Sequence, residues 1–132
     1  MSTTALPKAL VIDDNFHNRH IFRIALEEKG YHVEEAENGS DGLKILQEKT
    51  FNLLVLDLQM PLIDGVMVLR ELHMMPLHRS MRVLVVTANA HMATGEVTDQ
   101  ADYVMYKPIN VMEFAEFADR LKSIRVSSTT SS

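Results

Sequence analysis

Short apolar runs separated by longer mixed segments give this chain its pattern. Each run is bounded by turn signals and is predicted to form a buried strand. Strands of this kind are typical of parallel sheets that helices cover on both faces. The runs lie at residues 9–12, 53–56, 83–86 and 103–106, and a further strand is predicted to begin at residues 31–33.

Helical spacing of apolar residues fills the segments between the strands. Gly30 is expected to end the first helix as a C-cap, and Ser40 and Asp64 to cap the second and third. Asn110 and Glu113 resemble a capping box at the start of the last helix. The positions that define the predicted helices are Ile21, Ile24, Ala25 and Glu28, then Leu43 and Leu46, then Leu69 and Leu72, and finally Phe114, Phe117, Ala118, Leu121 and Ile124.

The segment between Thr87 and Asp102 has the weakest helical pattern. Thr94, Gly95 and Thr98 are poor helix formers, so a short or irregular fourth helix is expected. The element order is then a strand followed by a helix, five times over. Right-handed crossovers turn that order into an α/β fold, a doubly wound, flavodoxin-like five-stranded parallel sheet with strand order 2-1-3-4-5.

Composition limits the class of protein. The length of 132 residues fits one domain, predicted at 8–126, with tails at 1–7 and 127–132 that lack apolar periodicity. No cysteine is present, and no apolar run approaches the roughly 20 residues that span a bilayer. The net charge is −5 and the basic residues are scattered. These features predict a cytoplasmic protein with no membrane insertion and no direct contact with nucleic acid.

Polar residues follow the strands at the edge where ligands bind in parallel α/β sheets. Asp13, Asp14 and Asp57 follow the first and third strands, whereas Thr87 and Lys107 follow the fourth and fifth. Each taken singly has an ordinary role as a cap, a surface lysine or a strand-end threonine. Their common placement predicts one site.

Three carboxylates in one crevice need compensation. Two charges 4 Å apart repel by about 4 kcal/mol at an effective dielectric constant near 20. Either the pKa of one carboxyl rises or a cation binds, and an all-oxygen site suits Mg²⁺ or Mn²⁺. Lys107 and Thr87 suit phosphoryl oxygens, and a carboxylate such as Asp57 can act as a nucleophile toward phosphorus.

At this point the sequence resembles the receiver domain of two-component response regulators, from about residue 8 to residue 124. Details such as Asn18-Arg19 and Thr87-Ala88-Asn89-Ala90 are most similar to receivers attached to hybrid histidine kinases. The motifs that carry the resemblance are Asp13-Asp14-Asn15, Asn38-Gly39, Leu56-Asp57-Leu58-Gln59-Met60-Pro61, Asp64-Gly65, Thr87-Ala88 and Lys107-Pro108.

The resemblance implies a role for each matching site residue. Asp57 would be the phosphoacceptor, and Mg²⁺ would be bound by the carboxylates of Asp14 and Asp57 and the main-chain carbonyl of Gln59, with Asp13 acting through a water molecule. Lys107 would hold the phosphoryl group, and its bond to Pro108 would be cis. Thr87, which Ala88 follows, would move its hydroxyl to the phosphoryl group on activation.

The resemblance also implies partners. The donor would be a histidine kinase or a histidine phosphotransfer protein, and the chain would catalyse only its own phosphorylation and slow dephosphorylation. Its output would be contact with another protein. Because little sequence follows the last predicted helix, a single-domain regulator and a receiver cut from a larger kinase are both open.

Three departures from the receiver pattern concern signalling. Receivers usually carry an aromatic residue three positions before the lysine, where this chain has Val104 between Tyr103 and the pair Met105-Tyr106. The interval from Thr87 to Lys107 is about two residues shorter than usual, and the glycine before the fifth strand is missing. We therefore expect signalling to depend on the order or position of residues 90–102.

Two further functions remain as alternatives. An aspartate-nucleophile phosphatase would require a second acid two residues after its nucleophile, where this chain has Gln59. A degenerate receiver would bind a partner without phosphorylation, and Val104 favours that reading. Sustained turnover of a phosphate ester would select the first, and partner binding that survives Asp57→Ala would select the second.

Overall fold

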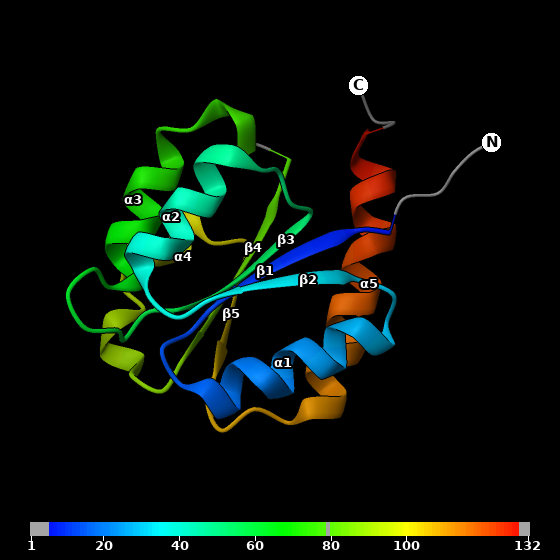
Figure 1. The fold of residues 1–132 in the computed structure, drawn as a ribbon, viewed down its shortest axis with the longest axis horizontal. Coiled ribbons are helices and arrows are strands. Elements are labelled where there is room, and N and C mark those ends of the chain that lie inside the picture. The colour runs from blue at the N-terminus through cyan, green and yellow to red at the C-terminus, as the bar shows by residue number, and fades with distance from the viewer. Residues whose placement is uncertain (1–5, 79, 130–132) are drawn as a thin grey trace.

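A computed structural model describes residues 6–78 and 80–129 of the chain, without the side chains of 77 and 123–129. Within this part, one parallel sheet has the strand order β2-β1-β3-β4-β5 (Figure 1). The predicted doubly wound α/β fold is confirmed. The strands are β1 (Lys8–Ile12), β2 (His32–Ala36), β3 (Leu53–Asp57), β4 (Arg82–Thr87) and β5 (Tyr103–Tyr106).

Helices cover both faces of the sheet. Figure 1 shows α2, α3 and α4 on one side and α1 and α5 on the other. Two short 3₁₀ turns, η1 (Pro76–His78) and η2 (Ala90–Met92), flank β4. The helices are α1 (Phe16–Glu28), α2 (Gly39–Glu48), α3 (Gly65–His73), α4 (Gly95–Gln100) and α5 (Val111–Thr129).

Successive residues of each strand pack alternately into two hydrophobic clusters, one on each face of the sheet. Leu10 and Ile12 of β1 pack with Leu46, Leu69 and the other apolar residues of the α2–α4 layer. Ala9 and Val11 pack with the α1–α5 layer, where the rings of Phe22 and Phe114 lie 4.8 Å apart. A strand buried on both faces leaves only its ends for polar residues, which places the chemistry at the sheet edge.

The helix boundaries correct one predicted cap and confirm others. The second helix begins at Gly39, and its N-cap is Asn38 instead of Ser40, because the Asn38 side chain accepts the Asp41 N–H at 2.7 Å. Asp64 and Asn110 accept N–H groups three residues onward, as predicted. Gly30 follows α1 with φ +90°, a conformation that favours glycine.

The buried face of α1 differs from the predicted one. Ile21 and Ile24 are 42% and 45% exposed, whereas Arg19, Phe22, Ala25 and Leu26 are buried. The helix is rotated by about one position because Phe22 packs against Phe114. An arginine therefore occupies a core-facing position, which apolar periodicity does not predict.

The length of α4 and the end of α5 can be compared with the predictions. The six-residue α4 is short, as expected, and its N-cap Thr94 makes no side-chain capping bond. Helix α5 continues past residue 126, where the domain was expected to end, to Thr129. Most of the predicted tail 1–7, residues 130–132 and the side chain of Ile124 lie outside the described part. No helix within the described residues is long and apolar enough to cross a bilayer.

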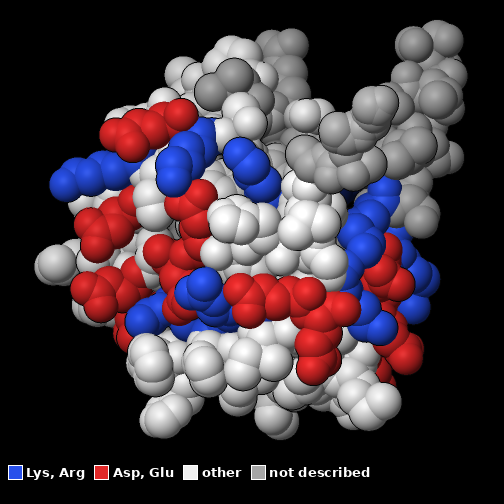
Figure 2. Space-filling model, turned by 45° about the vertical axis from the view of Figure 1, so that its right-hand side comes forward, with Lys and Arg blue, Asp and Glu red and all other residues white. Residues whose placement is uncertain are grey.

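Charges are interspersed on the surface that Figure 2 draws. Lysine and arginine side chains alternate with aspartate and glutamate, and no basic stripe crosses this face. Ion pairs in the described part of the chain include Lys49 with Glu34 and Lys122 with Asp119.

Candidate functional site

The strand register brings the predicted site residues to one edge of the sheet. Ile12 of β1 pairs with Leu56 of β3, so the residues that follow each of them meet across the strand pair. Carboxylate oxygens of Asp13, Asp14 and Asp57 all lie within 4.8 Å of one another. The cluster lies where the strand order reverses, between β1 and β3, as the topology predicts.

Asp57 has a raised pKa in this cluster. Its residue is 5% exposed, and burial together with the nearby Asp13 carboxylate raises its pKa from 3.8 to about 6. The positive charge of Lys107 and the N–H of Gln59, which donates to Asp57 Oδ1 at 3.2 Å, oppose this rise. A perturbed carboxyl beside other charges at a sheet crevice is a functional candidate.

Lys107 joins the far end of the sheet to this cluster. Its Nζ donates to Asp13 Oδ2 at 3.1 Å and lies 3.7 Å from Asp57 Oδ2. Its own N–H donates to the carbonyl of Thr87 at 2.9 Å, which continues the β4–β5 ladder, and its bond to Pro108 is cis, as the resemblance implies. The Lys107 side chain is 18% exposed, and its ammonium can reach a group bound over the carboxylates.

Thr87 and its neighbours border the site on the β4 side. Thr87 is fully buried, and its Oγ1 accepts the N–H of Asn89 at 3.1 Å. Ala88 is exposed directly after the strand, and Gln59 is exposed after β3. The hydroxyl of Thr87 thus holds the start of the loop that leads to α4.

Gly65, the first residue of α3, lies directly against the backbone of Asp57 and Leu58. A Cβ at this position would lie 2.5 Å from the Asp57 carbonyl oxygen and 2.6 Å from Leu58 Cα. The Gly65 N–H also donates to the Leu58 carbonyl at 2.9 Å. Glycine is therefore required because helix α3 begins in direct contact with the backbone that carries Asp57.

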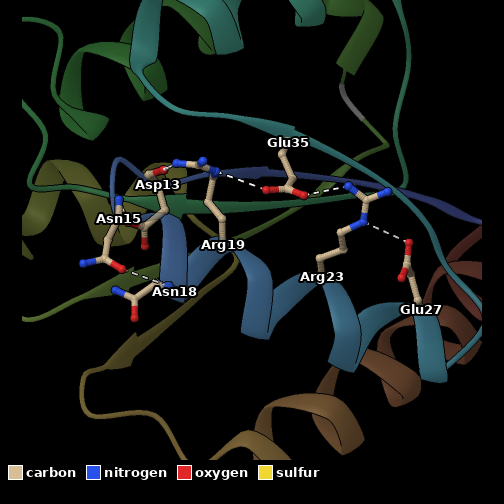
Figure 3. A network of polar contacts seen from close by, with 7 residues as sticks. All are labelled: Asp13, Asn15, Asn18, Arg19, Arg23, Glu27 and Glu35. Atoms are coloured by element: carbon tan, nitrogen blue, oxygen red, sulfur yellow. Dashed lines mark hydrogen bonds and ion pairs between the residues drawn. The ribbon is translucent and has the colours of Figure 1, made fainter.

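A polar network behind the acidic cluster was not predicted. Figure 3 shows Arg19 of α1 between the main chain of Asp13 and the carboxylate of Glu35 on β2, which in turn contacts Arg23. Sequence reasoning treated α1 as a packing helix and gave Arg19 no role. Its signal in the sequence is a charged residue one turn into a helix that follows two acidic residues.

Val104 of β5 is partly buried. It packs against the cluster on the α2–α4 side, whereas Tyr103 faces the opposite layer and contacts the Phe117 ring edge-on at 4.7 Å. Tyr106 is 51% exposed. Tyr103 cannot take the place of a side chain at Val104 because neighbouring strand residues face opposite sides. Tyr106, two positions after Val104, does not take that place either, because its side chain is exposed.

A family model matches most of this chain. The model of the response regulator receiver domain matches residues 9–119. This chain belongs to that family. The predicted resemblance is confirmed, and receivers of hybrid histidine kinases also occur among the relatives.

Curated relatives of this receiver include whole regulators and a receiver of similar size. The chain is 44% identical over 81 residues to the virulence regulator BvgA of Bordetella pertussis, covering 61% of this chain and 38% of that protein. It is 32% identical over 114 residues to the polar-differentiation response regulator DivK of Brucella anthropi, covering 84% of this chain and 93% of DivK. This receiver therefore spans well under half the length of BvgA.

A solved structure shares both the fold and part of the sequence. The response regulator TrrA of Thermotoga maritima, crystallised in complex with Mg²⁺-BeF, is 29% identical to this receiver with a TM-score of 0.79. The match covers 88% of this chain and 99% of TrrA. The similarity therefore extends over most of this chain and nearly all of TrrA.

Proposed function

We propose that this receiver accepts a phosphoryl group on the carboxylate of Asp57. The donor is a phosphohistidine of a histidine kinase or a histidine phosphotransfer protein, and the output is contact with another protein. The observation that carries the proposal is the buried Asp57 carboxylate within reach of two more carboxylates and the Lys107 ammonium. The chain itself is the acceptor and acts on no separate substrate.

The carboxylate cluster fits a hard divalent cation. Its three oxygens lie within 4.8 Å of one another, and Lys107 alone leaves the Asp57 pKa at about 6, so the site has an excess of negative charge. Oxygen ligands of this kind suit Mg²⁺, or Mn²⁺, held by one or two carboxylates and a phosphate. The ligands we assign are Asp14, Asp57 and the Gln59 main-chain carbonyl, with Asp13 acting through water. Bound there, the cation would offset negative charge on the phosphoryl oxygens.

The proposed step forms one bond and breaks another. An Asp57 carboxylate oxygen bonds to phosphorus while the phosphorus–nitrogen bond to the donor imidazole breaks. The imidazole nitrogen keeps that electron pair and takes up a proton from solvent. Because the Asp57 pKa is about 6, the carboxyl is mostly ionised, and so nucleophilic, at pH 7.

Two residues of the chain act on the phosphoryl oxygens. Lys107 supplies positive charge from a short distance, since its ammonium already lies 3.7 Å from Asp57. Thr87 Oγ1 accepts from Asn89, so its own O–H can donate to a phosphoryl oxygen. Ala88 is exposed directly after Thr87, and its small side chain would leave room for the group.

Intact-protein mass spectrometry with acetyl phosphate and Mg²⁺ tests the proposal. We expect one added phosphoryl group, lost when the metal is chelated or when Asp57 is changed to Asn. Asp64→Asn is the matched control, because Asp64 caps α3 outside the carboxylate cluster and this variant should be phosphorylated normally. An unmodified wild-type chain, or equal modification of Asp57→Asn, would contradict the proposal.

The second candidate function is a phosphorylation-independent interaction module, favoured by the partly buried Val104 at the usual aromatic position. Once a partner has been isolated, its affinity for wild-type and Asp57→Ala proteins separates the two functions. Unchanged affinity, with no effect of acetyl phosphate, would select this module.

A further inference from the structure

We propose that Arg19 is a positioning residue that holds the acidic cluster in place for Mg²⁺. The inference rests on the function proposed for Asp57. Arg19 lies on the first turns of α1 and is 9% exposed. Its Nη1 donates a buried 2.8 Å hydrogen bond to the main-chain carbonyl of Asp13 (Figure 3). It therefore acts through the backbone of the loop that carries two of the three carboxylates.

Each polar group of Asp13 makes a hydrogen bond to another residue. Its N–H donates to the Ala36 carbonyl of β2 at 3.2 Å, and its carbonyl accepts from Arg19. Oδ1 accepts the N–H of Asn15 at 2.8 Å, and Oδ2 accepts from Lys107. The two main-chain hydrogen bonds of Asp13, to β2 and to Arg19, fix the path of the loop after β1. They thereby fix the backbone position of the next residue, the exposed Asp14.

Glu35 of β2 keeps Arg19 in this position. Its Oε1 accepts from Arg19 Nε at 3.1 Å, and its Oε2 accepts from Arg23 Nη1 at 2.7 Å. Burial alone would raise the Glu35 pKa, but the bonds from Arg23 and Arg19 outweigh it and lower the pKa. Glu35 thus stays ionised at neutral pH, and its two oxygens orient both guanidinium groups.

The planar guanidinium explains why arginine suits this position. Nε and Nη1 point to different partners, so one side chain joins β2 to the β1–α1 loop. Burying a charged side chain costs folding free energy unless the charge is paired. Arg19 is paired with Glu35, and it also donates to a main-chain carbonyl next to the proposed metal ligands. Groups that orient metal ligands from behind typically alter metal affinity 10–100-fold when they are removed.

Arg19→Met is the test variant, since it keeps much of the side-chain length and removes both bonds. Arg23→Met is its matched control, because Arg23 binds Glu35 and Glu27 on the exposed side of the network. Mg²⁺ titration of the full chain, followed by amide chemical shifts, should give at least about 10-fold weaker binding in Arg19→Met. The control should stay within about twofold of wild type, as expected for an exposed ion pair.

Phosphorylation by acetyl phosphate separates positioning from a general loss of structure. In Arg19→Met the Mg²⁺ concentration for half-maximal rate should rise by the same factor as the dissociation constant, whereas the rate at saturating Mg²⁺ should fall less. Equal Mg²⁺ affinities for Arg19→Met and Arg23→Met would overturn the proposal. If Arg19→Met does not fold, Glu35→Gln takes its place; it should weaken Mg²⁺ binding less than tenfold but more than Arg23→Met, and no weakening would overturn the proposal.

Amide hydrogen exchange of residues 13–15 without Mg²⁺ tests the same inference independently. Exchange should be faster in Arg19→Met than in wild type or Arg23→Met, and unchanged exchange would overturn the inference. A wild-type chain that neither binds Mg²⁺ nor is phosphorylated would refute the proposed function. The exchange result would then still decide whether Arg19 positions the loop.

Discussion

Lys107 and Asp13 are 94 residues apart in the chain, yet the Lys107 ammonium donates a 3.1 Å hydrogen bond to Asp13 Oδ2. This bond ties the end of β5 to the end of β1 across the two strands between them, β3 and β4, and the ammonium lies 3.7 Å from Asp57 Oδ2. Burial and the nearby Asp13 carboxylate outweigh the opposing charge of Lys107, and the Asp57 pKa therefore remains high. The site is thus short of positive charge until a cation or a change of protonation supplies it.

Removing the Lys107 charge should raise the Asp57 pKa above about 6, because that charge lowers it. We expect this in Lys107→Met, measured by ¹³C NMR titration of the Asp57 carboxyl without Mg²⁺. Phosphorylation by acetyl phosphate should slow by about 100-fold, the usual effect of losing one group that stabilises the transition state. Lys49→Met is the control, since Lys49 pairs with Glu34 on the edge strand, and an equal Asp57 pKa in both variants would contradict this account.

Stability should depend on pH through Asp57 in the absence of metal. Its folded-state pKa of about 6 exceeds the ordinary value of 3.8, so the native state binds more protons than the unfolded state between these pH values. The contribution of Asp57 to the unfolding free energy therefore decreases as pH rises from about 4 to 6 and stays low above it. The difference between the folded and unfolded pKa values corresponds to a change of about 3 kcal/mol in the unfolding free energy.

Asp57→Asn should consequently be more stable than wild type at pH 7, by up to about 3 kcal/mol, and lose this advantage near pH 4. Urea unfolding at both pH values, with Mg²⁺ chelated, gives the comparison. A variant that is less stable than wild type at pH 7, or whose difference does not change with pH, would show that Asp57 is not perturbed.

Gly65 and Gly95 make a matched pair for backbone contact at the site. Gly65→Ala places a Cβ against the Asp57 carbonyl and should lower the unfolding free energy by about 1–3 kcal/mol, with slower phosphorylation. Gly95→Ala meets no atom within 4 Å and should be neutral or stabilising, by at most about 1 kcal/mol. Denaturant unfolding measures both, and equal effects would contradict the packing that we describe.

Phosphorylation should change the order of residues 90–102. Thr87 Oγ1 holds the N–H of Asn89 just before this segment, and Glu96 is tied to Arg70 of α3 by two bonds, one of 2.9 Å. If Thr87 donates to the phosphoryl group, the loop that it anchors should shift. Hydrogen exchange of 90–102 should differ between phosphorylated and unmodified protein and differ less in Thr87→Ala; identical exchange in wild type would refute this.

The strands and their order could be predicted because parallel strands buried on both faces appear as continuous apolar runs. The polar residues after them then identify the sheet edge where Asp13, Asp14, Asp57 and Lys107 meet. Turn residues such as Asp64 and Asn110 show their capping role in the local sequence, because the bonds they make are local.

Other features depend on contacts that no local pattern carries. Arg19 lies on the buried side of α1 because its partners, Glu35 and the Asp13 carbonyl, come from other elements. Asn38 and Ser40 both suit an N-cap, and local sequence does not distinguish them; in the structure the Asn38 side chain accepts the Asp41 N–H.

Locating the phosphoryl group within the chain tests the central claim most directly. After phosphorylation with acetyl phosphate and Mg²⁺, borohydride reduction converts an aspartyl phosphate to homoserine, which peptide mass spectrometry locates. Our account predicts homoserine at position 57 and unmodified aspartate at 13 and 14. Homoserine at another aspartate, or none in a chain that has gained a phosphoryl group, would contradict the assignment of Asp57 as the acceptor.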